Sequence, residues 1–224
     1  MPPGADVRVS VIIPVHNGAR YLAQAIESVL AQDLAAHEII VVDDGSTDES
    51  ASIAGGFGSL VRVLRQTQRG PNAARNAGVS AATGAFLAFL DADDLWAPAK
   101  LARQIESFEA ISGLDVVFTY VRNFCSPELT AAQRKRIVCP PEAMPGMIPS
   151  SLLLRTASFL PFAENLVVGE LVLWLDRIRD LNLKVHTLPE VLVSRRLHET
   201  NLGRSLGDGR RDYLVAVKEM LDSL

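Results

Sequence analysis

Acidic and polar side chains follow three apolar stretches of this chain, each at the point where the stretch would end as a β-strand. These residues are Pro14, Val15, His16 and Asn17, then Asp43 and Asp44, and finally Asp91, Ala92, Asp93 and Asp94. In open α/β sheets the carboxyl ends of the strands meet at one crevice, and ligands bind there. Five carboxylates in one crevice repel one another unless hydrogen-bond donors or a cation are present, and a divalent metal ion would relieve that repulsion.

A single residue separates Asp91 from Asp93. On an extended segment or a turn, this spacing lets one carboxylate face a ribose hydroxyl while the other binds Mg²⁺ or Mn²⁺, cations that also bind phosphate oxygens. An isolated Asp-x-Asp is more often turn or helix-cap chemistry. The pattern therefore becomes specific only together with the other two strand ends.

The elements that carry these residues begin with a strand, a helix and a second strand. Residues 7–13 and 38–42 are β-branched and apolar, and apolar residues at helical spacing between them predict a helix that ends near Gln32. Ser46 with Glu49 three residues later is a capping-box signature for the next helix. The chain is thus expected to start a second strand-helix unit directly after the first.

The alternation continues to the third acidic stretch. A short strand is predicted at 61–64, a helix that Pro71 opens and Gly84 closes, and an apolar strand at 85–90. Strict alternation of this kind predicts an α/β fold in which helices flank a mainly parallel central sheet.

The second half of the chain is predicted to be more irregular. It should contain a helix with Pro98 in its first turn, a strand at 116–120, a helix preceded by Gly169 and Glu170, short strands at 185–188 and 191–195 around Pro189, and a final helix at 212–221. Five prolines lie within 126–150, which predicts a long, partly mobile loop, and the basic residues 134–136 are interpreted as a solvated helix face. We expect one domain, 1–224, with halves at 7–110 and 111–224.

Composition excludes several classes of protein. The 224 residues are 48% hydrophobic and 21% charged, so a disordered chain is excluded. A net charge of −4 argues against nucleic-acid binding, and two cysteines are too few for a disulfide framework. No apolar run is long enough to span a membrane and no leader pattern opens the chain, so a cytoplasmic location is expected.

Four motifs in this order, at 9–17, 41–48, 74–78 and 89–94, closely resemble family 2 glycosyltransferases with the GT-A fold. The resemblance covers roughly residues 8–105. It implies that 7–110 is the half that binds a nucleotide sugar and that 111–224 faces the acceptor, with the loop at 126–150 as a candidate lid. Asn76 and Gly78, in the third motif, are interpreted as packing residues.

The resemblance also implies roles for individual residues. The nucleotide-sugar contacts would be Pro14, Val15, His16, Asn17, Asp43, Asp44, Arg75, Asp91 and Ala92. Of the two carboxylates on the second strand, Asp44 would lie nearer the base, while Arg75 would lie near the base or the diphosphate. Asp93 would bind Mg²⁺ or Mn²⁺ as cofactor, and His198, in an Arg-x-His sequence, would contact the metal or the diphosphate.

The catalytic base is the one position where the chain departs from its relatives. Many of them open a helix with a Glu-Asp pair whose Asp is the base, but this chain has Gly169-Glu170 there. Alignment through Leu173-Trp174-Leu175 places Glu170 at the base position, whereas another alignment places Leu171 there. Trp174 and Trp96 are interpreted as core aromatics, although Trp96 could border the acceptor site.

These observations favour an inverting, metal-dependent glycosyltransferase. It would move a sugar from a nucleoside diphosphate sugar, expected to be a UDP-sugar, to an acceptor hydroxyl, with Glu170 taking the proton. The acceptor stays open among saccharide, lipid-linked and peptide classes, and a lipid acceptor would require peripheral membrane docking.

Two alternatives stay open beside this reading. One is a catalytically inactive relative that acts as a binding or scaffold module. The other is a sugar-phosphate nucleotidyltransferase, although that class needs a Gly-rich phosphate loop where this chain has Pro14-Val15-His16-Asn17. A dehydrogenase is excluded because Gly55-Gly56-Phe57-Gly58 lacks the strand-turn-helix context of a dinucleotide fingerprint.

Overall fold

A computed structural model of the chain describes residues 6–140, 142–166 and 170–201, although not the side chain of Glu170. The first half contains β1 (Val9–Val15), α1 (Ala19–Leu30), β2 (Glu38–Asp44), α2 (Ser50–Gly55), β3 (Val61–Gln66), α3 (Pro71–Ala81), β4 (Phe86–Phe89), β5 (Leu95–Trp96) and α4 (Lys100–Ala110). The second half contains β6 (Val116–Cys125), α5 (Ala131–Arg136), β7 (Met144–Pro145), β8 (Leu153–Arg155), α6 (Glu170–Asp180) and β9 (Val185–Leu197). Short 3₁₀ turns lie at Gly58–Leu60, Pro149–Ser151 and Thr156–Ser158. The predicted helix at 212–221 lies outside the described residues.

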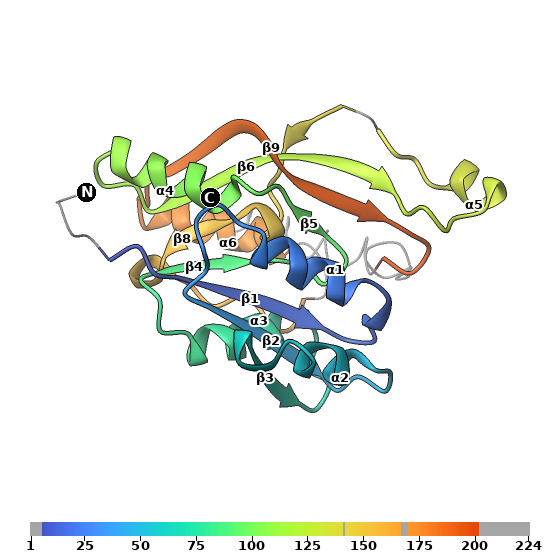
Figure 1. Cartoon of the computed structure of the whole chain (residues 1–224). Helices are drawn as coiled ribbons and strands as arrows, with labels where there is room; N and C mark the ends of the chain where they lie inside the picture. The colour runs from blue at the N-terminus through green and yellow to red at the C-terminus, as the bar shows by residue number, and fades with distance from the viewer. Residues whose placement is uncertain (1–5, 141, 167–169, 202–224) are drawn as a thin grey trace.

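Within the described residues the strands form one sheet in the order β3-β2-β1-β4-β8-β6-β9-β5, with β7 added beside β6 (Figure 1). The strands β3, β2, β1 and β4 are all parallel, as predicted. Beyond β4 the sheet is mixed, because β8 runs antiparallel to both β4 and β6 while β9 runs parallel to β6. The expectation of a mainly parallel sheet therefore holds only where each strand returns through a crossover helix.

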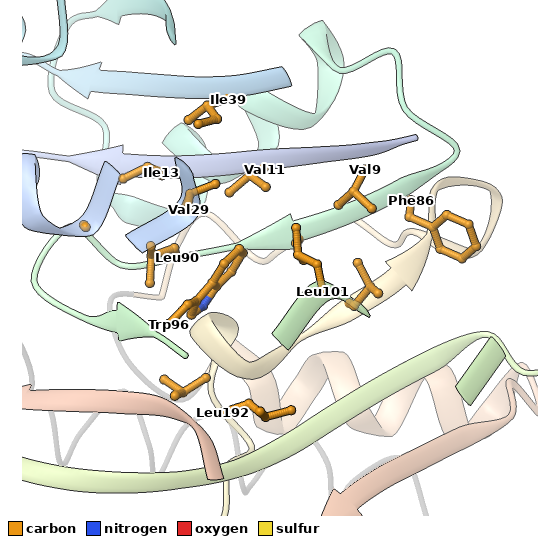
Figure 2. Packing of buried hydrophobic residues seen from close by; sticks show 14 of the residues in the cluster. Val9, Val11, Ile13, Val29, Ile39, Phe86, Leu90, Trp96, Leu101 and Leu192 are labelled. Atoms are coloured by element: carbon orange, nitrogen blue, oxygen red, sulfur yellow. The ribbon is translucent and has the colours of Figure 1, made fainter. Parts of the chain in front are cut away.

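Helices cover both faces of this sheet. Alternate residues of β1 point to opposite sides, so Val11 packs with α1, α2 and α4 while Ile12 packs with α3 and α6. Figure 2 shows the first of these clusters, in which Val9, Val11 and Ile13 meet Val29 and Leu101. The central strands β1, β2 and β4 are buried almost throughout, so the polar residues that follow them reach solvent at the ends of these strands.

Three local predictions, on two helix starts and one strand break, were wrong or incomplete. The capping box is absent: the Asp48 carboxylate, not Ser46, accepts the Ser50 backbone N–H at 3.0 Å near the start of α2. Pro98 precedes α4 in a turn, because the helix begins only at Lys100. The two strands predicted around Pro189 are one strand, β9, because Pro189 lies where the β6–β9 register shifts and no ladder donor is needed.

The segment 126–150 is not a simple loop. It contains the short helix α5, which has a true capping box between Thr130 and Gln133, and the bridge strand β7. The basic residues of α5 are exposed, as expected for a solvated helix face. Among the described residues no helix is both long and apolar enough to cross a membrane.

Candidate active site

A cleft of about 850 Å³ opens at the carboxyl ends of β1, β2 and β4. From the first half of the chain its walls include Pro14, Val15, His16, Asn17, Gly18, Arg20, Tyr21, Asp44, Gln68, Gly70, Arg75, Asp91, Ala92, Asp93 and Asp94. From the second half they include Met147, Ile148, Pro149, Leu171, Val172, Arg195, His198, Thr200 and Asn201. Every residue predicted to bind the nucleotide sugar or the metal lines this cleft except Asp43.

The loop after β1 is fastened to the loop after β2. The Asn17 backbone N–H donates to Ser46 Oγ at 2.9 Å, and its side-chain oxygen accepts the Thr47 N–H at 2.8 Å. Asn17 has a φ of 51°, in the left-handed region that Asn tolerates better than most residues. Asp48 accepts the Ala19 N–H at 2.9 Å and so anchors the start of α1. This wall of the cleft is therefore already formed without a ligand.

The two carboxylates that end β2 have different surroundings. Asp43 is buried outside the cleft, where it accepts the Ser46 N–H at 3.0 Å and the Arg65 Nε–H at 3.0 Å. Asp44 lines the cleft, and its Oδ1 accepts from Gln66 at 2.7 Å and from the Arg69 N–H at 2.8 Å. Its Oδ2 accepts only the Gly70 N–H, at 2.7 Å. One lone-pair site of Asp44 is thus left for a ligand donor, whereas Asp43 shapes the turn.

His16 lies beside Asp44 on the cleft wall. Its Nδ1 lies 2.8 Å from the Asp44 carbonyl oxygen, which can only accept, so this nitrogen carries the proton. Its Nε2 then accepts from the amides of Asn17 and Gln68, each at 3.2 Å. These contacts hold the ring in place on the side of the cleft, and its predicted role as a wall of a nucleotide pocket stays a prediction.

Arg75 forms the floor of the cleft next to the third strand end. Its guanidinium donates to Asp91 Oδ1 at 2.6 Å and to Asn72 Oδ1 at 2.7 Å, and it lies over the Phe162 ring at 5.8 Å. The Arg75 side chain is only 5% exposed, whereas that of Asp91 is 32% exposed. Arg75 thus orients Asp91 and places positive charge beneath the cleft.

Asp93 and His198, which are 105 residues apart in the sequence, lie side by side in the cleft. His198 Nε2 lies 2.9 Å from Asp93 Oδ2, and the Asn201 side-chain amide donates to the same oxygen at 3.0 Å. The buried Arg196 supports the pair, because its Nε–H donates to the Asp93 carbonyl at 2.9 Å and its guanidinium lies 4.7 Å from the Tyr21 ring. The predicted proximity of His198 to Asp93 is therefore present in the structure.

Asp94 belongs to the scaffold of the site. It is buried and accepts the Ser150 hydroxyl at 2.7 Å and the Arg196 backbone N–H at 3.0 Å. Burial, with the neighbouring charges of Asp93 and Asp91, raises the pKa of Asp94 well above its usual range. Each of the five acidic side chains thus accepts hydrogen bonds from neighbouring groups, and three of them, Asp43, Asp44 and Asp94, are buried.

Asp93 and His198 also suit a divalent cation. A carboxylate oxygen is the donor that Mg²⁺ and Mn²⁺ prefer, and imidazole is a common metal ligand. In the part of the chain that the structure describes, no group of three or more His, Cys, Asp or Glu side chains is arranged as a metal site. Two protein ligands fit an ion whose remaining positions are taken by water and by phosphate oxygens, as is usual for Mg²⁺.

The helix α6 begins at Glu170, and the next two residues, Leu171 and Val172, line the cleft. The start of α6 therefore borders the cleft. The role of Glu170 as a base stays a prediction, since its side chain and residues 167–169 lie outside the described part of the chain.

The residues interpreted as packing residues do pack. A Cβ on Gly78 would meet Ile12 Cγ2 at 2.5 Å, so only glycine fits where α3 crosses β1. Asn76 exchanges hydrogen bonds with the Phe162 backbone, both at 3.0 Å. The Trp96 and Trp174 rings are buried, and the indole N–H of Trp96 donates to the Ser150 carbonyl at 2.7 Å.

Several residues of the site were not predicted. Tyr21 lines the cleft, packs 4.8 Å from the His198 ring and hydrogen-bonds to Glu128, and Gln68 and Asn72 hold His16 and Arg75. The helical spacing of Tyr21 indicated only a buried face. Asn72 directly follows Pro71 at the start of a helix, and this polar position in a buried helix start was the one available signal.

The fold and the cleft define an α/β protein that receives its ligand at the carboxyl ends of parallel strands. The model of glycosyl transferase family 2 matches residues 10–161. The chain therefore belongs to this family.

Relatives and solved structures agree with this assignment. The chain is 47% identical over 107 residues to an uncharacterized glycosyltransferase of Nostoc. The matched residues make up 46% of this chain and 33% of the relative. It is 34% identical over 168 residues to the succinoglycan biosynthesis protein ExoO of Rhizobium meliloti, covering 69% of this chain and 46% of ExoO. The chain thus spans less than half the length of either protein.

Two solved structures show that the fold is the GT-A fold. Staphylococcus aureus TarS, in complex with UDP-GlcNAc, superposes with a TM-score of 0.74 at 22% identity over 95% of this chain and 65% of that one. Glucosyl-3-phosphoglycerate synthase from Mycobacterium tuberculosis, in complex with Mn²⁺, UDP and glucosyl-3-phosphoglycerate, superposes with a TM-score of 0.66 at 21% identity over 98% and 85%.

Proposed function

We propose that this chain transfers a sugar from a UDP-sugar to an acceptor hydroxyl, with inversion at the anomeric carbon. The observation that carries the proposal is the pairing of Asp93 with His198 at 2.9 Å in the cleft that His16 and Asp44 also line. A diphosphate joins a nucleoside to a sugar, so a donor of this class needs both a nucleoside wall and a phosphate end. Family membership and neighbours solved with UDP or UDP-GlcNAc support the choice of donor.

The nucleoside would lie between the loop after β1 and the loop after β2. Asp44 has one lone-pair site left, which suits one N–H donor of a base, while Asn17 and Val15 bound the same wall. Asp91, next to Ala92 on the cleft floor, has one oxygen held by Arg75 and would direct the other to a ribose hydroxyl. Arg75 is paired with Asp91, so its part in the site is to hold that carboxylate in place.

Asp93 and His198 would hold Mg²⁺ or Mn²⁺ together with the diphosphate. When bound, such an ion supplies charge neutralisation for the leaving phosphate. Asn201 and Arg196 keep the Asp93 carboxylate in place through hydrogen bonds to its side chain and its carbonyl. The chain itself thus contributes the fixed geometry of the phosphate end.

Glu170 would be the general base that takes the proton of the acceptor hydroxyl. It is the first residue of α6, and the start of a helix favours an ionised carboxylate, which a base requires. The apolar residues Met147, Ile148 and Leu171 line the cleft on this side and would limit water near the anomeric carbon. Displacement by the acceptor oxygen from the side opposite the diphosphate gives inversion.

An inactive binding module is the alternative, because the chain has Gly169-Glu170 where many relatives have a Glu-Asp pair. The two functions differ in turnover and share nucleotide binding. A nucleotidyltransferase is disfavoured because the loop from Pro14 to Asn17 is tied by its own hydrogen bonds to the loop after β2 and offers no row of free backbone N–H groups.

Calorimetry of UDP with and without Mn²⁺ tests the proposal. We expect UDP to bind the wild type more tightly with Mn²⁺, and Asp93→Asn to lose this dependence while it keeps metal-free binding. Asp43→Asn is the matched control, because that carboxylate lies outside the cleft. Binding of UDP that is equally strong in wild type and Asp93→Asn at every Mn²⁺ concentration would contradict the metal assignment, and no binding at all would contradict the donor.

A further inference from the structure

A buried asparagine joins helix α3 to the segment 163–166, which precedes α6 in the chain. Asn72 lies in the first turn of α3 and is 1% exposed. Its side-chain amide donates two hydrogen bonds, to the Ala163 carbonyl at 3.0 Å and to the Leu166 carbonyl at 2.8 Å. Both acceptors lie on the segment that leads to α6. One side chain therefore fixes the path of the chain shortly before the predicted base.

The other end of the same amide connects to the strand that carries the acidic motif. Asn72 Oδ1 accepts from Arg75 at 2.7 Å, and the same guanidinium donates to Asp91 Oδ1 at 2.6 Å. Asn72 and Arg75 are buried at 1% and 4% exposure, so water does not screen these bonds. Asp91, Arg75 and Asn72 thus form a continuous chain of short hydrogen bonds from the cleft floor to the 163–166 segment.

The apolar contacts of α6 reinforce this connection. Leu171, Trp174 and Ile178 of α6 pack in the same cluster as Ala74, which lies on α3 close to Asn72. The Trp174 indole N–H donates to the Leu160 carbonyl at 2.8 Å. The helix is therefore held by packing, while Asn72 holds Ala163 and Leu166, which precede it in the chain.

We propose that Asn72 is a positioning residue for the transfer step. It holds the start of α6 at a fixed place relative to Asp91, so that a base on α6 meets a donor held at the strand ends. This inference rests on the proposed function. The amide is the group that suits the position, because it accepts from a guanidinium and donates to two carbonyls at once, and no carboxylate or hydroxyl does all three.

The informative variant is Asn72→Asp. Its carboxylate still accepts from Arg75, but the second oxygen faces two carbonyl oxygens that it repels. The matched control is Asn76→Ala on the next turn of α3, because Asn76 binds the same segment at Phe162 and Glu164 and the alanine adds no repelling carboxylate. We expect Asn72→Asp to lower kcat about 10²-fold with UDP affinity and donor KM within about twofold, since misplacement by about 1 Å costs that much. The control should keep kcat within about threefold.

Hydrogen exchange supplies a second measurement that needs no turnover. Amides of 171–178 should exchange faster in Asn72→Asp than in wild type or in Asn76→Ala, while amides of β1 keep their protection. Asn72→Ala, which removes both amide donors without adding a charge, carries the same expectation if the aspartate variant does not fold. The comparison is made on the full chain without ligand.

Three results would overturn the inference. One is an equal loss of UDP affinity and kcat in Asn72→Asp, because the residue would then act on the donor through Arg75. Another is an equal loss of kcat in the Asn76 control, and the third is unchanged exchange of the α6 amides. If the wild type transfers no sugar, the proposed function fails, and the exchange measurement still decides whether Asn72 positions α6.

Discussion

Replacing Asp44 and Asp43 one at a time tests which carboxylate reads the nucleotide. Asp44→Asn keeps the shape of the side chain but turns one acceptor oxygen into a donor. The cleft-facing lone pair beside the Gly70 bond is then lost, and with it one hydrogen bond from the base. A hydrogen bond to a charged group contributes about 1.5–3 kcal/mol, so UDP affinity should fall about 10- to 150-fold.

The same change has a stability cost that can be separated from binding. An amide at this place leaves the Gly70 N–H facing a donor, which costs about 1–3 kcal/mol, or roughly 2–4 °C in Tm for each kcal/mol in a chain of this size. Asp43→Asn faces only Ser46 and the exposed Arg65, outside the cleft. We expect it to change UDP affinity less than about threefold, because the buried Asp43 carboxylate lies outside the cleft.

Isothermal calorimetry at a temperature well below both melting points measures the two affinities on folded protein. Thermal unfolding without ligand gives the stability change of each variant. If Asp43→Asn weakens UDP binding as much as Asp44→Asn, or more, then the lone pair of Asp44 is not the contact that the base uses, and the proposed orientation of the nucleoside is wrong.

Three further expectations concern catalysis, packing and pH. Glu170→Gln should lower sugar transfer about 10²-fold or more at unchanged UDP affinity, and wild-type turnover would place the base elsewhere. Gly78→Ala forces a Cβ to within 2.5 Å of Ile12, so a loss of about 1–2 kcal/mol is expected in denaturant unfolding, after the gain in helix propensity. Burial raises the pKa of Glu128, but hydrogen bonds from Ser126 and Tyr21 more than offset this effect, so the pKa is lowered to about 2. A carboxyl with a lowered pKa stabilises the fold above pH 4.5 and loses that contribution as the pH falls toward 2, so the Tm of Glu128→Gln should fall less than that of the wild type over this range, and parallel curves would contradict the assignment.

The parts of the site that the sequence predicts are those that depend on local rules. Parallel strands bring their carboxyl ends to one edge, so Asp44, Asp91 and His16 could be placed in one cleft from strand patterns alone. Gly78 could be assigned to packing because it lies in an Ala-rich helix beside a sheet. The pairing of His198 with Asp93 followed only from the family resemblance, because no local pattern relates residues so far apart in the chain.

The parts that could not be predicted depend on tertiary contacts. Asp43 and Asp44 are chemically identical neighbours, and only the path of the following loop turns one into the cleft. Ser46 satisfies the capping-box pattern, yet its hydroxyl accepts from Asn17 on another loop. Pro189 predicts a break, but a bulge against β6 absorbs it. In each case contacts with a distant part of the chain override the local rule.

The pairing of β6 with β9 has a consequence for how the molecule forms. These strands are parallel, and Val116 pairs with Val185, about seventy residues later in the chain. Contacts between such distant segments form slowly, because the intervening chain must first lose conformational freedom. The nucleoside wall, built from β1, β2 and their short loops, can assemble well before β9 aligns. His198 follows β9 directly, so the contact between His198 and Asp93 forms only once β9 has joined the sheet.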